Sequence, residues 1–119
     1  MSIYIDAIVI PVPKAKLAEY RKLAEVSAEV WCAHGALTYT ECEADDAKPG
    51  TVTSFPQSVD LKPDETVVIA WITYPSRDVR DAVVAKVMQD PRLGGLDPKT
   101  MPFDAKRMYW GGFKTFIAR

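Results

Sequence analysis

The chain has 119 residues, enough for one domain whose core buries roughly two-thirds of the unfolded surface. Hydrophobic residues make up 48% and charged residues 26%, a balance that excludes a disordered chain and a membrane-spanning one. Lys and Arg number 15 against 16 Asp and Glu, and the resulting net charge of -1 predicts neither nucleic acid nor a membrane as a partner.

The first two predicted elements are a strand and a long helix. Ile3 to Val12 has a period of two, is rich in β-branched residues and meets Pro11 and Pro13 at its end. Lys14 to His34 then changes to helical spacing, and Gly35 follows in the position expected of a helix C-cap. One face of this predicted helix carries Tyr20, Leu23, Ala24, Ser27, Val30, Trp31 and His34.

A second strand and a long polar segment come next. Ala36 to Glu43 alternates in the manner of a strand. Ala44 to Asp64 is polar and interrupted by proline and glycine, as loops are. Because a structureless segment of this length is uncommon in a compact domain, we expect Val52 to Phe55 to extend the sheet as a short arm.

The third strand is the clearest in the chain. Glu65 to Tyr74 is apolar on both sides of its alternation. Ser76 is a good N-cap and Asp78 suits the first turn, so a second helix is predicted from there to a point near Pro91.

The last predicted strand follows a loop that contains Gly94, Gly95 and Pro98. Arg107 to Trp110 is typical of a strand, and the adjoining pair of glycines, Gly111 and Gly112, predicts a bulge or a close backbone approach.

This order of elements predicts the fold class. Strand, helix, strand, strand, helix, strand matches the ferredoxin-like βαββαβ sandwich, an α+β fold with an antiparallel sheet and both helices on one face. We expect residues 1–119 to form a single domain. The first and third strands are apolar on both sides, so a face without helices would expose a large apolar patch, and we expect a homodimer to bury it.

The cellular compartment is predicted from two features. The beginning of the sequence has no basic leader followed by an apolar run, which predicts a cytoplasmic location. Cys32 and Cys42 lack the spacing of a C-x-x-C motif or of a structural zinc site, so we expect two free, partly buried thiols.

His34 is the only histidine and therefore the natural candidate for a base or a proton shuttle. At the end of a helix, a histidine can instead interact with the terminal carbonyl groups, and this structural role is the alternative. One histidine cannot form a multi-histidine metal site within a protomer, and we expect neither a metal nor a cofactor.

A group of carboxylates and a phenol is also a candidate site. Glu41 and Tyr39 share one face of the second strand, and Asp6 could lie on a neighbouring strand, so the three could meet beneath the helices. Alternatively, Glu41 could face the dimer interface and pair there with Arg107. The nearby acidic pair, Asp45 and Asp46, is expected to be solvated loop charge.

Several aromatic residues could line an apolar pocket between helix and sheet, or could simply fill the core, and core packing is favoured for Trp31 and Trp71. They are Trp31, Trp71, Tyr74, Tyr109 and Trp110. The candidate catalytic residues are therefore His34, Glu41 and Asp6. The candidate ligand-binding residues are Trp31, Tyr39, Trp71, Tyr109 and Arg107.

Motifs along the whole chain resemble those of the DUF1428 (YbaA-like) family. They include His34-Gly35-Ala36-Leu37, Tyr74-Pro75-Ser76, Asp90-Pro91-Arg92, Met101-Pro102-Phe103-Asp104 and Gly111-Gly112-Phe113. The resemblance implies a dimeric α+β barrel of ferredoxin-like protomers and no established activity. Relatives in the wider superfamily include monooxygenases and isomerases, but a shared fold does not transfer chemistry.

Three functional hypotheses follow. The first is a homodimer that binds a small apolar or aromatic molecule in the cleft between helix and sheet. The second is a cofactor-independent monooxygenase or isomerase that uses His34 with a nearby carboxylate. The third is a structural or regulatory dimer without a ligand.

Overall fold

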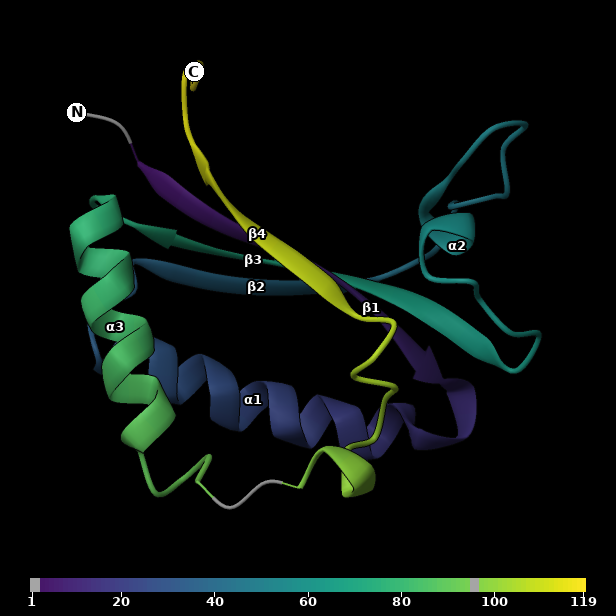
Figure 1. The fold of residues 1–119 in the computed structure, drawn as a ribbon, viewed down its shortest axis with the longest axis horizontal. Coiled ribbons are helices and arrows are strands. Elements are labelled where there is room, and N and C mark those ends of the chain that lie inside the picture. The colour runs from purple at the N-terminus through teal and green to yellow at the C-terminus, as the bar shows by residue number, and fades with distance from the viewer. Residues whose placement is uncertain (1–2, 95–96) are drawn as a thin grey trace.

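A computed structural model describes residues 3–94 and 97–119 and shows a four-stranded sheet with two long helices (Figure 1). Short 3-10 turns at Lys14–Lys16 and Pro98–Thr100 complete the described elements. The helices and strands are β1 (Tyr4–Pro13), α1 (Leu17–Ala33), β2 (Thr38–Glu43), α2 (Phe55–Ser58), β3 (Glu65–Tyr74), α3 (Arg77–Gln89) and β4 (Tyr109–Lys114).

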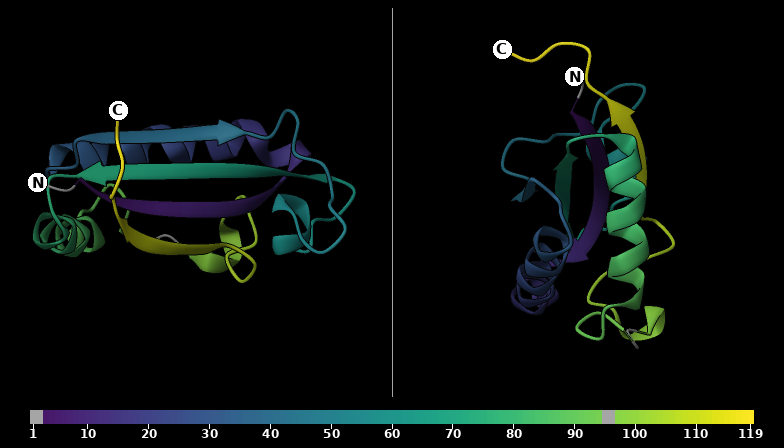
Figure 2. Two further views of the ribbon diagram at one scale, coloured as in Figure 1. Left: turned by 90° about the horizontal axis from the view of Figure 1, so that it is seen from above. Right: turned by 90° about the vertical axis from the view of Figure 1, so that its left-hand side faces the viewer.

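The sheet has the strand order β2-β3-β1-β4, and each neighbouring pair is antiparallel. Residue Ile8 of the central strand β1 lies opposite Ala70 of β3 and Trp110 of β4. Helices α1 and α3 lie on the same side of the sheet, as Figure 2 shows. The predicted ferredoxin-like α+β fold is therefore confirmed.

The alternation of β3 reveals which face of the sheet the helices cover. Its even-numbered residues Val68, Ala70, Ile72 and Tyr74 are buried. Val68, Ile72 and Tyr74 pack in two core clusters with residues of α1 and α3. The intervening residues Ile69, Trp71 and Thr73 are half-buried and point to the opposite face. We call the first the helix-covered face and the second the uncovered face.

Local signals explain where both long helices begin or end. The side chain of Ser76 accepts a hydrogen bond from the Val79 backbone N–H at 3.2 Å, which confirms the predicted N-cap of α3. Gly35 follows α1 with φ of 120°, a left-handed conformation that favours glycine, and the predicted C-cap position is confirmed.

The predicted sheet arm at residues 52–55 is wrong. Residues 55–58 form the short helix α2 instead. The reason is local, because Ser54 accepts a hydrogen bond from the Gln57 backbone N–H and Pro56 sits in the first turn, where proline is well tolerated.

The two glycines of β4 form no bulge. Gly111 and Gly112 pair in unbroken register with Ala7 and Asp6 of β1. The crowding at Gly112 comes from side chains and not from another backbone segment, because a Cβ atom there would clash with the Tyr4 hydroxyl and the Arg80 guanidinium. Glycine is needed here because side chains of β1 and α3 occupy the space above it.

The two cysteines are free, as predicted, but the expectation that they are partly buried is wrong because both are exposed. Cys32 lies near the end of α1 away from the core, and Cys42 lies opposite Ile69 on the uncovered face.

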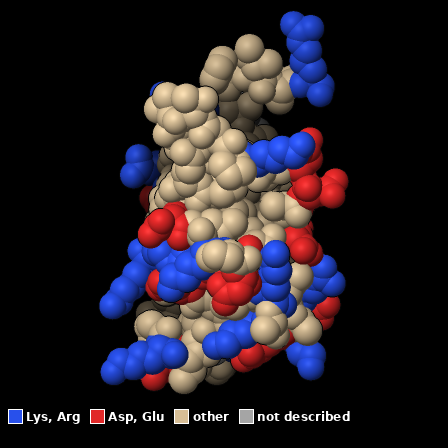
Figure 3. Space-filling model, turned by 90° about the vertical axis from the view of Figure 1, so that its right-hand side faces the viewer, with Lys and Arg blue, Asp and Glu red and all other residues tan. Residues whose placement is uncertain are grey.

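Charged residues show no large segregation by sign on the end of the molecule seen in Figure 3, where the described basic and acidic side chains are interspersed. This fits the net charge of -1. In the described part of the chain, no helix is both long enough and apolar enough to cross a membrane.

Candidate functional site

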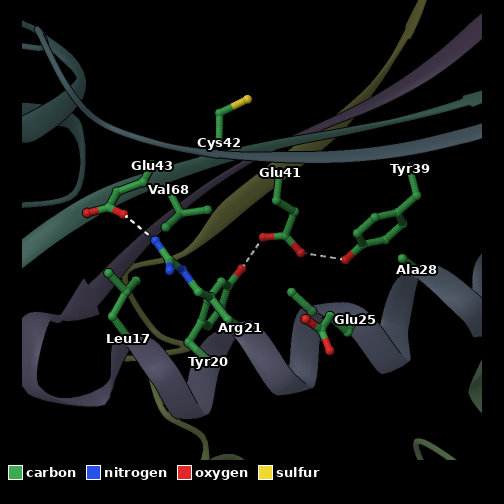
Figure 4. A pocket seen from close by; sticks show the side chains of 11 residues that line it. Leu17, Tyr20, Arg21, Glu25, Ala28, Tyr39, Glu41, Cys42, Glu43 and Val68 are labelled. Carbon is green, nitrogen blue, oxygen red and sulfur yellow. Dashed lines mark hydrogen bonds and ion pairs between the residues drawn. The ribbon is translucent and has the colours of Figure 1, made fainter.

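Glu41 lies between two tyrosines on the helix-covered face of the sheet (Figure 4). Tyr39 and Glu41 are two positions apart in β2, so both side chains extend toward α1, while Cys42 points the other way. The Tyr39 hydroxyl donates to one carboxylate oxygen at 2.7 Å, and the Tyr20 hydroxyl of α1 donates to the other. We call Tyr20, Tyr39 and Glu41 the Glu41 centre.

Both phenols of the Glu41 centre are held in the protonated form. Tyr20 is only 5% exposed, and burial is the largest cause of its raised pKa. Burial likewise raises the pKa of Tyr39, and the negative charge of Glu41 raises the pKa of both. The two tyrosines therefore serve as hydrogen-bond donors to Glu41 throughout the neutral pH range.

An inner cavity of about 340 Å³ borders the Glu41 centre and is lined by α1, α3, the sheet and the segment between α3 and β4. Trp31 and Phe103 supply aromatic walls, and the Phe103 ring meets the Tyr20 ring edge-on at 5.8 Å. Aliphatic side chains and thioethers form most of the rest, including Ile8, Ile10, Leu93, Met101 and Met108. A mostly apolar cavity with a few convergent polar groups is typical of a small-molecule site.

An outer cavity of about 320 Å³ lies on the other side of the Glu41 centre, between α1 and β2. Tyr20, Tyr39 and Glu41 line both cavities. The outer cavity is more polar, and its Arg21 donates to Glu43 at 3.0 Å. A small molecule in either cavity could therefore contact Glu41.

Asp6 belongs to a second buried network under the helices. It is 4% exposed, and the Tyr74 hydroxyl donates to it at 2.9 Å. The Arg80 Nε atom of α3 lies 3.5 Å from its other oxygen, and Arg80 also donates to the Tyr4 hydroxyl at 3.0 Å. Burial raises the pKa of Asp6, although Tyr74 and Arg80 act in the opposite direction. We call these four residues the Asp6 centre.

The two centres are neighbours on one face but do not merge. Asp6 lies opposite Ile72, which lies opposite Tyr39, so β3 separates the two carboxylates. Trp31 connects the centres, because its indole N–H donates to Tyr74 at 3.1 Å and its ring lies 5.8 Å from that of Tyr39. The structure therefore brings Glu41 and Tyr39 together, while Asp6 has a different set of partners.

His34 joins neither centre. Its Nε2 atom lies 2.8 Å from Asp90, which follows α3 and also accepts hydrogen bonds from Arg92. The hydrogen bonds from Arg92, together with that from His34, lower the pKa of Asp90. His34 lines none of the cavities described above. Its contact ties the end of α1 to the end of α3, which differs from both the catalytic role and the carbonyl contact considered from the sequence.

Within the protomer Arg107 pairs with Glu65, which differs from the Glu41–Arg107 interface pair considered as an alternative from the sequence. Its guanidinium donates to both Glu65 oxygens at 2.8 and 2.6 Å and to Asp104 at 2.9 Å. It also donates to the backbone carbonyls of Val59 and Asp60. The Arg107 hydrogen bonds to Glu65 lower the pKa of that carboxyl and attach one wall of the inner cavity to the beginning of β3.

The predicted aromatic pocket is divided between the two faces of the sheet. Trp31 and Tyr74 lie on the helix-covered face, whereas Trp71 and Tyr109 line an apolar groove of about 300 Å³ on the uncovered face. Trp71 is therefore not part of the core. Trp110, on the edge strand β4, is 57% exposed.

Other sequence candidates have simpler surroundings. Asp45 and Asp46 are exposed, as predicted for solvated loop charge. Across residues 3–94 and 97–119, His, Cys, Asp and Glu side chains form no cluster of three suited to a metal ion.

Sequence reasoning missed Tyr20 and Arg80 as members of the two centres. Tyr20 was placed on the buried helix face, and a buried tyrosine hydroxyl requires a polar partner, which was an unused signal. The sequence contains no local pattern that predicts the role of Arg80, because its partner Asp6 lies far away along the chain.

Comparisons with known proteins place the chain in a family. The family described as "Protein of unknown function (DUF1428)" matches residues 3–105. A protein named "Uncharacterized protein YbaA" from Escherichia coli strain K12 is 44% identical over 114 residues, which cover 96% of this chain and 97% of the relative. The protein of that name from Shigella flexneri matches equally well.

Among solved structures, a dimeric ferredoxin-like protein from an uncultured marine organism has a TM-score of 0.61 at 10% identity. The match covers 100% of this chain and 98% of that one, and at this identity it supports the fold alone. Family match, relatives and topology agree with one another: the chain belongs to the DUF1428 family.

Proposed function

We propose that this protein binds a small, largely apolar molecule in the inner cavity. The observation that carries the proposal is the meeting of a mostly apolar cavity of about 340 Å³ with a carboxylate that two phenols hold in place. Apolar walls would supply most of the binding free energy, and the Glu41 centre would orient the ligand.

Filling the cavity tests the proposal. Ala24 and Ala28 lie one turn apart on α1, and Ala24 lines both cavities whereas Ala28 lines only the outer one. The probe is naphthylmethanol, an uncharged bicyclic alcohol, with binding measured by isothermal titration calorimetry. Ala24→Phe should abolish binding and Ala28→Phe should preserve it. Binding that survives Ala24→Phe in a folded variant would contradict the inner cavity as the site.

Proton transfer is the weaker alternative. The monooxygenase or isomerase hypothesis relied on His34 with Glu41 or Asp6, and the imidazole of His34 instead faces Asp90. Glu41 is then the remaining candidate base that borders a cavity. We therefore propose a binding protein ahead of an enzyme, and ahead of a purely structural dimer.

We also propose that two copies associate through the uncovered face. Its groove is lined by apolar side chains that water would otherwise contact, including Val9, Phe55, Ile69, Trp71 and Phe113. A two-fold axis lets such a surface bury itself against its copy. The similar solved structure is named a dimeric protein, which supports the proposal.

Analytical ultracentrifugation tests the association. We expect a species of twice 13.2 kDa at micromolar concentration, and Ile69→Lys on the uncovered face should shift it to the monomer. Val52→Lys, at a loop position that is 90% exposed, is the matched control and should remain dimeric. A monomeric wild-type protein would refute the proposed dimer.

A cytoplasmic location is proposed on narrower support. Both cysteines are free and exposed, a state that a reducing compartment maintains. A fluorescent fusion in a bacterial host, followed by fractionation, would test it.

A further inference from the structure

The hydrogen-bond donors around the inner cavity are all used within the protein. Four of its described lining side chains carry an N–H or O–H group, namely Tyr20, Ser27, Trp31 and Tyr39. Both tyrosines donate to Glu41, Ser27 donates to the Leu23 carbonyl at 2.9 Å, and Trp31 donates to Tyr74. What these groups still offer to a ligand is therefore acceptor capacity, on the two phenol oxygens, the serine oxygen and the Glu41 carboxylate.

The charge around the site is negative. Glu41 is the only ionisable acid among the described residues that line the inner cavity, and no Lys, Arg or His accompanies it there. The outer cavity adds one arginine and two further glutamates, Glu25 and Glu43, and that arginine, Arg21, already pairs with Glu43. A ligand beside Glu41 thus meets a negative charge without an adjacent basic partner inside the inner cavity.

Aromatic faces surround the same position. Trp31, Tyr20, Tyr39 and Phe103 all line the inner cavity, and the Trp31 and Tyr39 rings lie 5.8 Å apart with a tilt of 53°. The negative face of an aromatic ring attracts a cation, and desolvation strengthens this attraction.

We propose that the ligand is an organic cation, an apolar body that carries a protonated amine whose N–H groups donate to Glu41 and the phenol oxygens. This inference rests on the proposed function and specifies its ligand class. An ammonium group is a donor without acceptors, so it complements a site whose own donors are occupied. A carboxylate ligand would meet Glu41 with like charge, and a ketone or ester would place acceptor against acceptor.

The Asp6 centre offers an internal contrast. Asp6 is a buried carboxylate that, like Glu41, accepts from a tyrosine, but Arg80 lies beside it. Asp6 lines neither the inner nor the outer cavity. At Asp6 the cation beside the carboxylate is Arg80, a residue of the protein. At Glu41 the corresponding cation would be the ligand.

Three probes with one bicyclic body test the inference on the full chain by calorimetry: naphthylmethylamine as the cation, naphthylmethanol as the neutral molecule and naphthoate as the anion. We expect the cation to bind at least about tenfold more tightly than the alcohol, since its hydrogen bonds to Glu41 are charge-assisted. Naphthoate should bind most weakly of the three.

Removing the negative charge of Glu41 should abolish the preference for the amine over the alcohol. Glu41→Gln should reduce the affinity of the cation about tenfold and leave that of the alcohol within about twofold. Asp6→Asn is the matched control, because it neutralises a buried carboxylate that lines neither cavity and should preserve the cation preference. Circular dichroism checks that both variants fold, and Tyr39→Phe, which keeps the carboxylate, provides a second variant that should retain the preference in reduced form.

The outcomes separate the two proposals. If none of the three probes binds, the proposed small-molecule function of the inner cavity is refuted together with its ligand class. If the alcohol or naphthoate binds as well as the amine, or if Glu41→Gln leaves the preference unchanged, the organic-cation inference is overturned while binding in the cavity stands.

Discussion

Two carboxylates lie beneath the helices on the same face of the sheet, and they differ in what surrounds them. Asp6 accepts a hydrogen bond from Tyr74 and has the guanidinium of Arg80 at 3.5 Å. Glu41 accepts from Tyr20 and Tyr39 and borders two cavities. One acid is enclosed with a cation of the protein, and the other is held by neutral donors beside open space.

This difference suits Asp6 to stabilising the fold and Glu41 to binding a ligand. A buried carboxylate is expensive to desolvate unless a charge or several hydrogen bonds compensate it. At Asp6, the compensation comes from a fixed residue of α3, and the charge is sealed between helix and sheet. At Glu41, the phenols compensate in part and leave the carboxylate within reach of a small molecule.

The largest effect on stability is expected when the Asp6 centre loses its cation. Arg80→Met should lower the free energy of unfolding by about 3–5 kcal/mol, because it leaves a buried carboxylate without its partner. Urea denaturation measures the change. Arg77→Met is the matched control, since that side chain is 70% exposed, and should change stability by less than about 0.5 kcal/mol.

A double variant makes this prediction specific. Asp6→Asn combined with Arg80→Met removes both charges and should recover part of the loss. Equal destabilisation by Arg80→Met with and without Asp6→Asn would show that Arg80 acts through packing and not through Asp6.

A smaller effect is expected from removing one hydroxyl at each centre. Tyr74 is fully buried, so Tyr74→Phe should cost about 2 kcal/mol, because water cannot replace its bond to Asp6. Tyr20→Phe should cost about 1 kcal/mol, because the cavities beside Glu41 allow solvent to replace the lost donor. Thermal unfolding compares the two. A larger loss of stability from Tyr20→Phe than from Tyr74→Phe would contradict the view that the Asp6 centre is the more stabilising of the two.

Much of the fold was predictable because its signals are local. The alternation of residues 65–74, the serine before α3 and the glycine after α1 each act within a few residues. The common face of Tyr39 and Glu41 was predictable for the same reason, since residues two apart in a strand point the same way.

The rest depended on packing between distant segments. Both sides of β3 are apolar, so alternation alone could not decide that Trp71 faces away from the helices. Arg107 lies 42 residues from Glu65, and only the folded path of the segment before β4 makes them partners. Tyr20 contacts Glu41 because α1 packs on β2 with a particular rotation about its own axis. Helical spacing alone does not define that rotation.

The smallest effect expected is a pH dependence confined to the Asp6 centre. The pKa of Asp6 is raised above its usual value of 3.8, chiefly by burial, so the folded state holds this proton more tightly than the unfolded state does. Its contribution to stability is therefore complete below pH 3.8 and is lost as the pH rises through the folded pKa. Wild-type stability minus that of Asp6→Asn should fall across this range and then level off. Taking the difference cancels groups such as Glu65, whose lowered pKa acts in the opposite sense. A difference that rises with pH would mean that Arg80 outweighs burial, and that the Asp6 centre favours the charged acid.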